Sequence, residues 1–189
     1  MSFLYNRCAS IQYSYMGKIQ LTKPILITMH GFPGAGKTYF ARQLSGTIRA
    51  AHISSARIRG ELFDKPRYDD EENQVIDHLM QYMAEEFLNL GVSVIYDSDL
   101  SGAKKRKELK DLAKKHNAAH QLIWFQIDRD TAYARTLKRD KRRTDDKYSR
   151  EFTKSSYDAF ITSMKNPRQD EDYIVLSGKH SFPMQRSTI

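Results

Sequence analysis

The chain has 189 residues, of which 40% are hydrophobic and 29% charged, and its formal net charge is +8 at pH 7. A chain of this length fills one α/β core and leaves little material for a second, so we expect a single domain. No apolar run reaches the roughly 18 residues that a membrane-spanning helix needs, so we expect a soluble protein and no membrane partner. Cys8 is the only cysteine, so an intrachain disulfide is excluded and a reducing, cytoplasmic location is favoured.

The positive charge is concentrated in residues 104–115 and 135–143, a distribution that favours anionic partners. For the first cluster, the solvated face of a helix is an equally good interpretation. The six histidines show no metal-ligand spacing, so we expect structural or surface roles for them. Neither the oligomeric state nor the preferred nucleotide base follows from the sequence.

Residues 1–18 form the first segment along the chain. They contain no continuous apolar stretch and no small-residue cleavage site, so they do not have the pattern of a secretory signal. We expect a poorly ordered arm. Met16 stands just ahead of the first expected strand and is a plausible alternative translation start to Met1.

A phosphate-binding motif follows the first expected strand, residues 24–29. The motif is G-x-x-x-x-G-K-[ST] without a gap, and its residues are Gly31-Phe32-Pro33-Gly34-Ala35-Gly36-Lys37-Thr38. In such a loop the backbone N–H groups surround a phosphate chain, the lysine reaches the β- and γ-phosphates and the hydroxyl ligates Mg²⁺. We therefore expect residues 31–39, Tyr39 included, to bind a nucleoside triphosphate such as ATP. A helix starting at Thr38 directs its positive end at the anion. The alternative is a glycine-rich turn with a surface lysine.

The middle of the chain alternates strands and helices. We expect a strand at 51–54, a helix at 57–63, a loop at 64–68, a helix at 71–90 that ends at Gly91, and a strand at 92–96. The 71–90 helix is predicted by apolar residues at a helical period, which are Val75, Ile76, Leu79, Met80, Met83, Phe87 and Leu90. The strand at 92–96 places Asp97 and Asp99 at its carboxyl end.

The second half continues the same alternation. We expect a helix from 101 to 116 capped by Ser101, a strand at 122–127, a helix from Asp130 to about 140, a helix at 150–165 and a strand at 173–176. Trp124 is expected in the core. Residues 142–149 are almost wholly polar, so we expect a mobile lid around 138–150, and a C-terminal tail at 181–189. The alternation predicts an α/β fold with parallel βαβ units.

In a parallel α/β sheet, ligands gather at the carboxyl ends of the strands. The phosphate loop, Ser54, Asp97 and Asp99 all occupy such ends. Asp97 could hold Mg²⁺ through water, which would add it to Thr38 as a metal ligand. Arg135 and Arg139 are four residues apart, hence on one helix face, and a guanidinium can chelate two phosphate oxygens. Solvated helix-end cations are the alternative.

With these motifs the chain resembles the small P-loop kinases of the polynucleotide 5′-kinase, zeta-toxin and chloramphenicol phosphotransferase group, which have an AAA-type ATP-binding domain. The resemblance runs from Pro24 to Gly178 and rests on residues 31–38, 52–63, 91–97, 135–139 and 170–173. It implies a three-layer, nucleoside-kinase-like P-loop fold with a mostly parallel five-stranded sheet, and a lid that closes over ATP and Mg²⁺. It also implies that Arg135 and Arg139 are lid arginines and that Arg59 helps to hold the substrate region. We expect Ser54, Arg59 and Arg106 to contact the substrate.

One departure from that family concerns the acceptor-activating base. The family usually places an aspartate three residues before Arg59, where this chain has Ala56. We expect Asp97 or Asp99 to orient an acceptor hydroxyl instead, because a loose phosphoryl-transfer transition state demands positioning more than a strong base. Lys37, Asp97, Asp99, Arg135 and Arg139 are then the expected catalytic residues.

The acceptor stays open between a nucleic-acid 5′ end and a small metabolite. The basic clusters favour nucleic acid, but no base-stacking aromatic stripe lies beside them. A non-catalytic or weakly active ATP-binding module is the alternative function, because of Ala56. A motor ATPase is disfavoured by the short chain.

Overall fold

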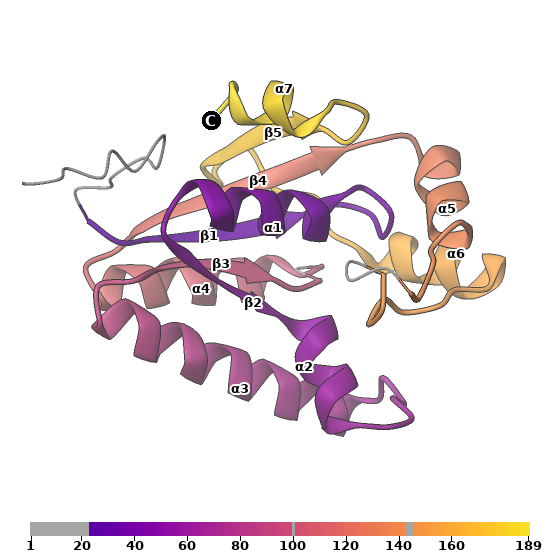
Figure 1. The fold of residues 1–189 in the computed structure, drawn as a ribbon, viewed down its shortest axis with the longest axis horizontal. Helices are drawn as coiled ribbons and strands as arrows, with labels where there is room; N and C mark the ends of the chain where they lie inside the picture. Colours follow the sequence, from indigo (N-terminus) through magenta and orange to yellow (C-terminus); the bar gives the residue numbers. More distant parts are fainter. Residues whose placement is uncertain (1–22, 100, 143–145) are drawn as a thin grey trace, which may run out of the picture.

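The protein is built around one parallel sheet. The computed structural model describes residues 23–99, 101–142 and 146–189, so the expected N-terminal arm and Met16 lie outside the described residues (Figure 1). The sheet order is β2-β3-β1-β4-β5, and every pairing is parallel. The strands are β1 (Ile25–His30), β2 (Ala50–Ser54), β3 (Ser93–Asp97), β4 (Ala119–Gln126) and β5 (Tyr173–Ser177). The predicted five-stranded α/β fold is confirmed.

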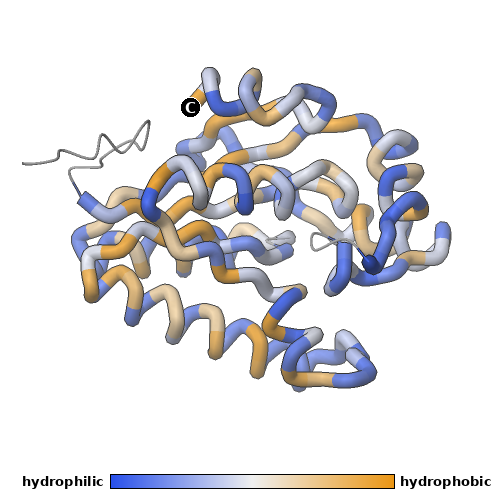
Figure 2. Tube along the Cα trace, in the orientation of Figure 1, coloured by the Kyte–Doolittle hydropathy of each residue, from blue (hydrophilic) through white to orange (hydrophobic). Residues whose placement is uncertain are grey.

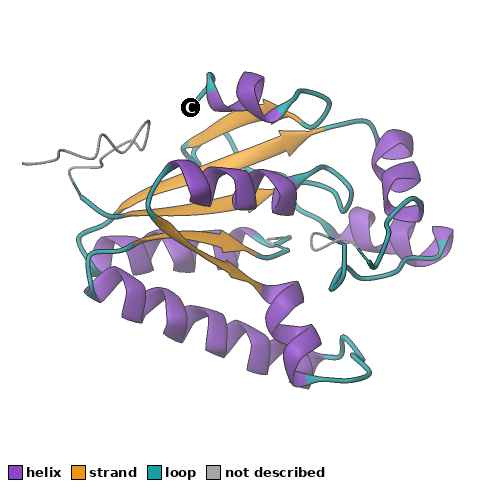
Figure 3. Ribbon diagram, viewed as in Figure 1, coloured by secondary structure: helices purple, strands orange, loops and turns teal. Residues whose placement is uncertain are grey.

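Helices cover both faces of the sheet, which gives three layers (Figures 1 and 3). On one face lie α1 (Lys37–Thr47) and α7 (Phe182–Arg186), and on the other α3 (Asp70–Asn89) and α4 (Ala103–Lys115). The helices α2 (Ser55–Leu62), α5 (Arg129–Leu137) and α6 (Lys154–Ser163) lie beyond the carboxyl ends of the strands. None of the described helices is both long enough and apolar enough to cross a membrane.

The central position of β1 explains its unbroken apolar sequence. Its side chains alternate between two cores: Leu26 packs with α3 and α4, while Ile27 and Met29 pack with α1. The helical period of α3 places Ile76 and Met80 on its buried side, and hydrophobic residues recur along that helix in Figure 2. Apolar burial on both faces therefore fixes the strand whose end becomes the phosphate loop.

Several boundaries differ from those expected, because a different residue caps the helix. Ser54 caps α2, so this helix begins at Ser55, and Asp128 caps α5 ahead of the expected start. Gly102, not Ser101, precedes α4. The chain leaves α5 after Leu137, and α6 begins at Lys154, so the described residues between these two helices form a long loop.

The C-terminal segment contains the short helix α7, which packs on the rest of the fold. Phe182 packs on Phe40 of α1, with 5.6 Å between the ring centroids. The side-chain amide of Gln185 donates to the Ser177 carbonyl at 2.9 Å and is buried. Residues 181–189, expected as a C-terminal tail, thus include the short helix α7, which one aromatic contact and one buried hydrogen bond hold against the rest of the fold.

Candidate active site

Backbone geometry accounts for the glycines of the phosphate loop. Gly31, Gly34 and Gly36 have φ values of +147°, +88° and +96°, a region that residues with a Cβ rarely adopt. At Gly34 a Cβ would lie 2.1 Å from the carbonyl oxygen of Ala132, so no side chain fits between the loop and α5. The loop is also braced by Tyr157, whose hydroxyl donates to the Pro33 carbonyl at 3.2 Å.

Lys37 begins α1, and its side chain folds back against the preceding phosphate loop. Its ammonium donates to the carbonyls of Gly31 at 2.6 Å and Phe32 at 3.2 Å, and it is 3.6 Å from Oδ1 of Asp99. The Lys37 side chain is 9% exposed, whereas that of Asp99 is 53% exposed. The cation is therefore fixed at the phosphate loop, while the Asp99 carboxylate is exposed at the same cavity.

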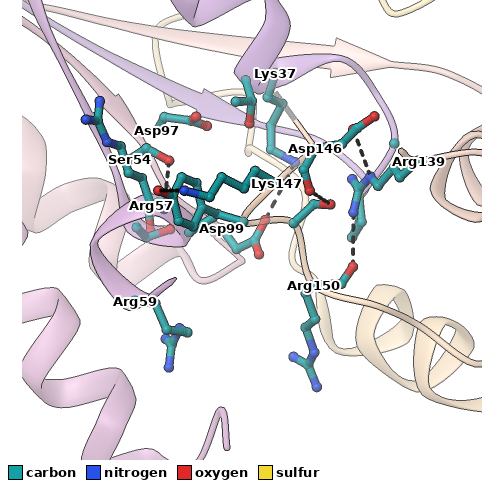
Figure 4. Close-up of a pocket in the computed structure, with 18 of the residues that line it drawn as sticks. Lys37, Ser54, Arg57, Arg59, Asp97, Asp99, Arg139, Asp146, Lys147 and Arg150 are labelled. Carbon is teal, nitrogen blue, oxygen red and sulfur yellow. Dashed lines mark hydrogen bonds and ion pairs between the residues drawn. The ribbon is translucent and has the colours of Figure 1, made fainter. Parts of the chain in front are cut away.

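One cavity of about 870 Å³ collects most of the predicted site residues (Figure 4). Ala56 also lines it, so this wall carries no carboxylate at that position. Gly31 and Phe32 instead line a second cavity of about 560 Å³ beside Trp124, and Ala35 is buried in the core. The predicted residues at the main cavity are Pro33, Gly34, Gly36, Lys37, Thr38, Tyr39, Ser54, Arg59, Asp97, Asp99, Arg135 and Arg139.

Asp97 has a partner that the sequence analysis missed. It ends β3 in register with Ser54 of β2, and its side chain is 5% exposed. Its Oδ2 lies 3.1 Å from Nε2 of His52, which also lines the cavity. His52 and Ser54 are two residues apart on one strand and so share a face. That spacing could have revealed His52 as a site residue.

Thr38 and Asp97 offer the hard oxygen ligands that Mg²⁺ prefers. Both line the cavity beside Lys37. Among the described residues no three His, Cys, Asp or Glu side chains gather into a metal site. The donors therefore fit a cation that takes its other ligands from nucleotide phosphates and water.

The arginines of α5 and the following loop reach the cavity from the lid side. Arg135 donates to the Gly178 carbonyl at 2.7 Å. Arg139 donates to the Arg150 carbonyl at 3.1 Å, and its Nε is 4.0 Å from Asp146 (Figure 4). Burial lowers the pKa of Arg139 from its ordinary value, and the charge of Asp146 opposes that effect. Arg135 and Arg139 therefore line the cavity with the phosphate loop, and backbone carbonyls hold both side chains.

Arg59 lines the cavity, and a buried ion pair fixes its side chain. It donates to Glu72 and, at 2.7 Å, to Asn73. Glu72 also accepts from the backbone N–H of Arg67 at 2.7 Å and of Tyr68 at 3.3 Å. Burial by itself would raise the pKa of Glu72, but these hydrogen bonds and the Arg59 charge lower it overall. Arg59 thus ties α2 to α3 at the cavity rather than standing free.

The expectation that Arg106 contacts the substrate is corrected by its surroundings. Arg106 is 2% exposed and does not line the main cavity. Its guanidinium donates to both carboxylate oxygens of Glu171, at 2.7 and 2.8 Å, and to the carbonyls of Lys165 and Asn166. These bonds lower the pKa of Glu171. Arg106 therefore anchors the segment before β5 to α4.

Residues 146–150, part of the segment expected as a lid, pack against α2 and the loop before α3. The Tyr148 ring packs directly on Gly60: a Cβ added at that glycine would lie 2.2 Å from Cδ1 of Tyr148. The Tyr148 hydroxyl donates to the Glu61 carboxylate. Arg150 lies 4.5 Å from the ring centroid of Tyr68. A side chain at position 60 would collide with the Tyr148 ring, so the glycine allows residues 146–150 to pack closely on α2.

Comparison with known proteins identifies the family of the chain. A profile of the AAA domain family matches residues 26–167. The chain belongs to the AAA domain family. This match covers the phosphate loop, Asp97, Arg135 and Arg139.

Solved structures share the fold at low sequence identity. A sugar kinase from Janibacter sp. superposes with a TM-score of 0.64 and 13% identity, over 87% of this chain and 91% of that one. Chaetomium thermophilum Kti12, solved with ADP-AlF3, gives 0.66 and 16% over 87% and 95%. A chain of the Pnkp1/Rnl/Hen1 RNA repair complex gives 0.62 and 18% over 76% of this chain and 45% of that one. The family and these neighbours confirm a small P-loop kinase-like domain, a fold that binds nucleotides.

Proposed function

We propose that the protein is an ATP- and Mg²⁺-dependent phosphotransferase of the cytoplasm that moves the γ-phosphate to an acceptor hydroxyl. The observation that carries the proposal is the cavity of about 870 Å³ in which the phosphate loop, Lys37, Asp99 and the lid arginines face one another. Phosphoryl transfer depends mainly on positioning and on charge stabilisation, and these residues supply both.

The residues divide into three roles. Lys37, Arg135 and Arg139 hold and neutralise the triphosphate. Thr38 and Asp97 would hold Mg²⁺, which would supply charge neutralisation to the phosphates when bound. The exposure of Asp99 and its 3.6 Å distance from Lys37 support its role in orienting the acceptor hydroxyl, whereas Asp97 is buried and paired with His52.

The second candidate function is a nucleotide-responsive binding module without transferase activity. It is favoured by Ala56, which leaves the α2 wall of the cavity without a carboxylate at the position where the related kinases carry a base. The acceptor of the first candidate is either a nucleic-acid 5′ end or a small metabolite.

The test is incubation with radiolabelled ATP, Mg²⁺ and mixed acceptors that include 5′-hydroxyl DNA and RNA. We expect label transfer by the wild type and none by Lys37→Ala, because the lysine at the phosphate loop is lost. Asp99→Asn should reduce turnover with little effect on ATP affinity, whereas Asp97→Asn should weaken Mg²⁺-dependent ATP binding. ATP binding without any labelled product would establish the binding module, and unchanged turnover in both variants would reject the roles given to the two aspartates.

A further inference from the structure

The Asp97 carboxylate is hydrogen-bonded through one of its two oxygens. Its Oδ2 lies 3.1 Å from Nε2 of His52, and the Asp97 side chain is only 5% exposed. An ionised carboxylate accepts hydrogen bonds and cannot donate them, so the His52 ring nitrogen is the donor. Among the described residues nothing donates to Oδ1 of Asp97, and this oxygen is not one of the fully buried atoms that lack a partner. The contact thus leaves Oδ1 open to a ligand in the cavity that Asp97 lines.

The register of the sheet brings the two side chains together. Strands β2 and β3 pair in parallel with His52 opposite Ile95, and Asp97 is two residues further along β3. Residues two apart on a strand share a face, so His52 and Asp97 lie diagonally across one face of the sheet. Ile95 packs in the core cluster that includes Phe40 of α1, so this is the face that α1 covers. Thr38, the other expected magnesium ligand, lies in the first turn of that helix and therefore on the same side of the sheet.

A short side chain does not by itself fix the direction of its carboxylate. The terminal torsion of an aspartate has broad, two-fold minima, so its two oxygens can exchange places. The hydrogen bond from His52 removes this freedom, because it ties Oδ2 of Asp97 to a ring on the neighbouring strand. Groups that orient a metal-binding side chain in this way typically change metal affinity by about 10- to 100-fold when they are lost. The contact is therefore of the kind that prepares a metal ligand.

We propose that His52 is a positioning residue for magnesium binding. Its ring holds Oδ2 of Asp97, so that Oδ1 is presented to the cation that accompanies the nucleotide phosphates. The proposal rests on the proposed function, in which Asp97 and Thr38 hold that cation. It gives His52 no contact with the nucleotide or the cation, so every effect of its removal passes through Asp97. The quantity that His52 controls is the strengthening of nucleotide binding by Mg²⁺.

The experiment compares nucleotide affinity with and without the metal. Calorimetry follows titration of the intact chain with a non-hydrolysable ATP analogue, once with saturating Mg²⁺ and once with EDTA. The dissociation constant in EDTA divided by that in Mg²⁺ measures the coupling between metal and nucleotide. We expect His52→Phe, which keeps a ring but has no donor, to lower this ratio about tenfold or more while the affinity in EDTA is unchanged. His52→Gln, whose amide can still donate to Asp97, should retain most of the wild-type ratio.

Two controls separate positioning from a general loss of structure. His78 is exposed on α3 and does not line the cavity, so His78→Phe makes the same substitution away from the site and should leave the ratio unchanged. His52→Phe combined with Asp97→Asn should lower the ratio no further than Asp97→Asn alone, because His52 acts through Asp97. Urea unfolding reports whether each variant is folded. If His52→Phe does not fold, His52→Ala removes the same donor without adding bulk.

The outcomes separate this inference from the proposed function. A wild-type ratio in His52→Phe, an equal loss in His52→Phe and His52→Gln, or a further loss beyond Asp97→Asn overturns the role of His52 while the phosphotransferase assignment stands. A wild-type affinity that Mg²⁺ does not change overturns the metal role of Asp97 and this inference with it. Failure of the wild type to bind the analogue at all overturns the proposed function and the inference together.

Discussion

Gly34→Ala is the substitution that best tests the geometry of the phosphate loop. At φ +88° an alanine costs about 1–2 kcal/mol for the left-handed backbone. Its Cβ would also lie 2.1 Å from the Ala132 carbonyl oxygen, a backbone atom of α5 that cannot rotate away. Overpacking of this kind costs about 1–3 kcal/mol. We therefore expect a total loss of about 3 kcal/mol in the free energy of unfolding, together with weaker ATP binding.

Alanine substitutions at two other glycines allow the backbone cost and the overpacking cost to be measured separately. Gly36 has φ +96° but nothing within 4 Å of the position that a Cβ would take, so Gly36→Ala should lose only the backbone cost of about 1–2 kcal/mol. Gly46 lies in α1 with open space around it and no positive φ, so Gly46→Ala should gain about 0.5–1 kcal/mol from helix propensity.

The assay is urea unfolding of the wild type and the three variants, with a fluorescent ATP analogue to follow binding. The expected order of stability, from the most to the least stable, is Gly46→Ala, wild type, Gly36→Ala and Gly34→Ala. If Gly34→Ala were no less stable than Gly36→Ala, the contact with α5 would not be the reason for glycine at position 34, and the described packing of the loop would be wrong.

Three further predictions concern the supports of the site and the sheet. Glu72→Gln should lower the free energy of unfolding by about 3 kcal/mol, because it leaves Arg59 buried without its counter-ion. Tyr157→Phe should cost about 1 kcal/mol in urea unfolding, because it removes the hydrogen bond to the Pro33 carbonyl. Burial lowers the pKa of His120 to about 4 from 6.5. The stability that the neutral imidazole contributes is therefore complete above pH 6.5, and it is lost as the pH falls toward 4 and the ring takes up a proton. The loss amounts to at most about 3 kcal/mol.

Each of these has a control. Glu71 is 90% exposed, so Glu71→Gln should change stability by less than about 0.5 kcal/mol, and an equal loss in both glutamate variants would contradict the buried pair. Tyr82→Phe serves the same purpose for Tyr157, because Tyr82 is 57% exposed. For the pH effect, the stability difference between wild type and His120→Asn should shrink from pH 7 to pH 4.5, and a constant difference would refute the role of His120.

The sequence by itself determined the features that depend on contiguous residues. The phosphate loop is one unbroken motif, so Lys37 and Thr38 could be placed without knowing the sheet. The apolar run of β1 and the helical period of α3 predicted two of the elements that build the core, because burial on both faces or on one stripe leaves a local pattern. The alternation of such patterns predicted the parallel sheet, and with it the edge at which Asp97 and Asp99 lie.

Only the tertiary structure decided which partner each charged side chain has. Arg59 and Arg106 look alike as sequence, yet one is held by Glu72 at the cavity wall and the other is buried with Glu171, 65 residues away. The pairing of His52 with Asp97 likewise depends on two strands lying side by side. A backbone turn is encoded by its own few residues, whereas the partner of a long charged side chain is chosen by which distant segment folding brings within reach.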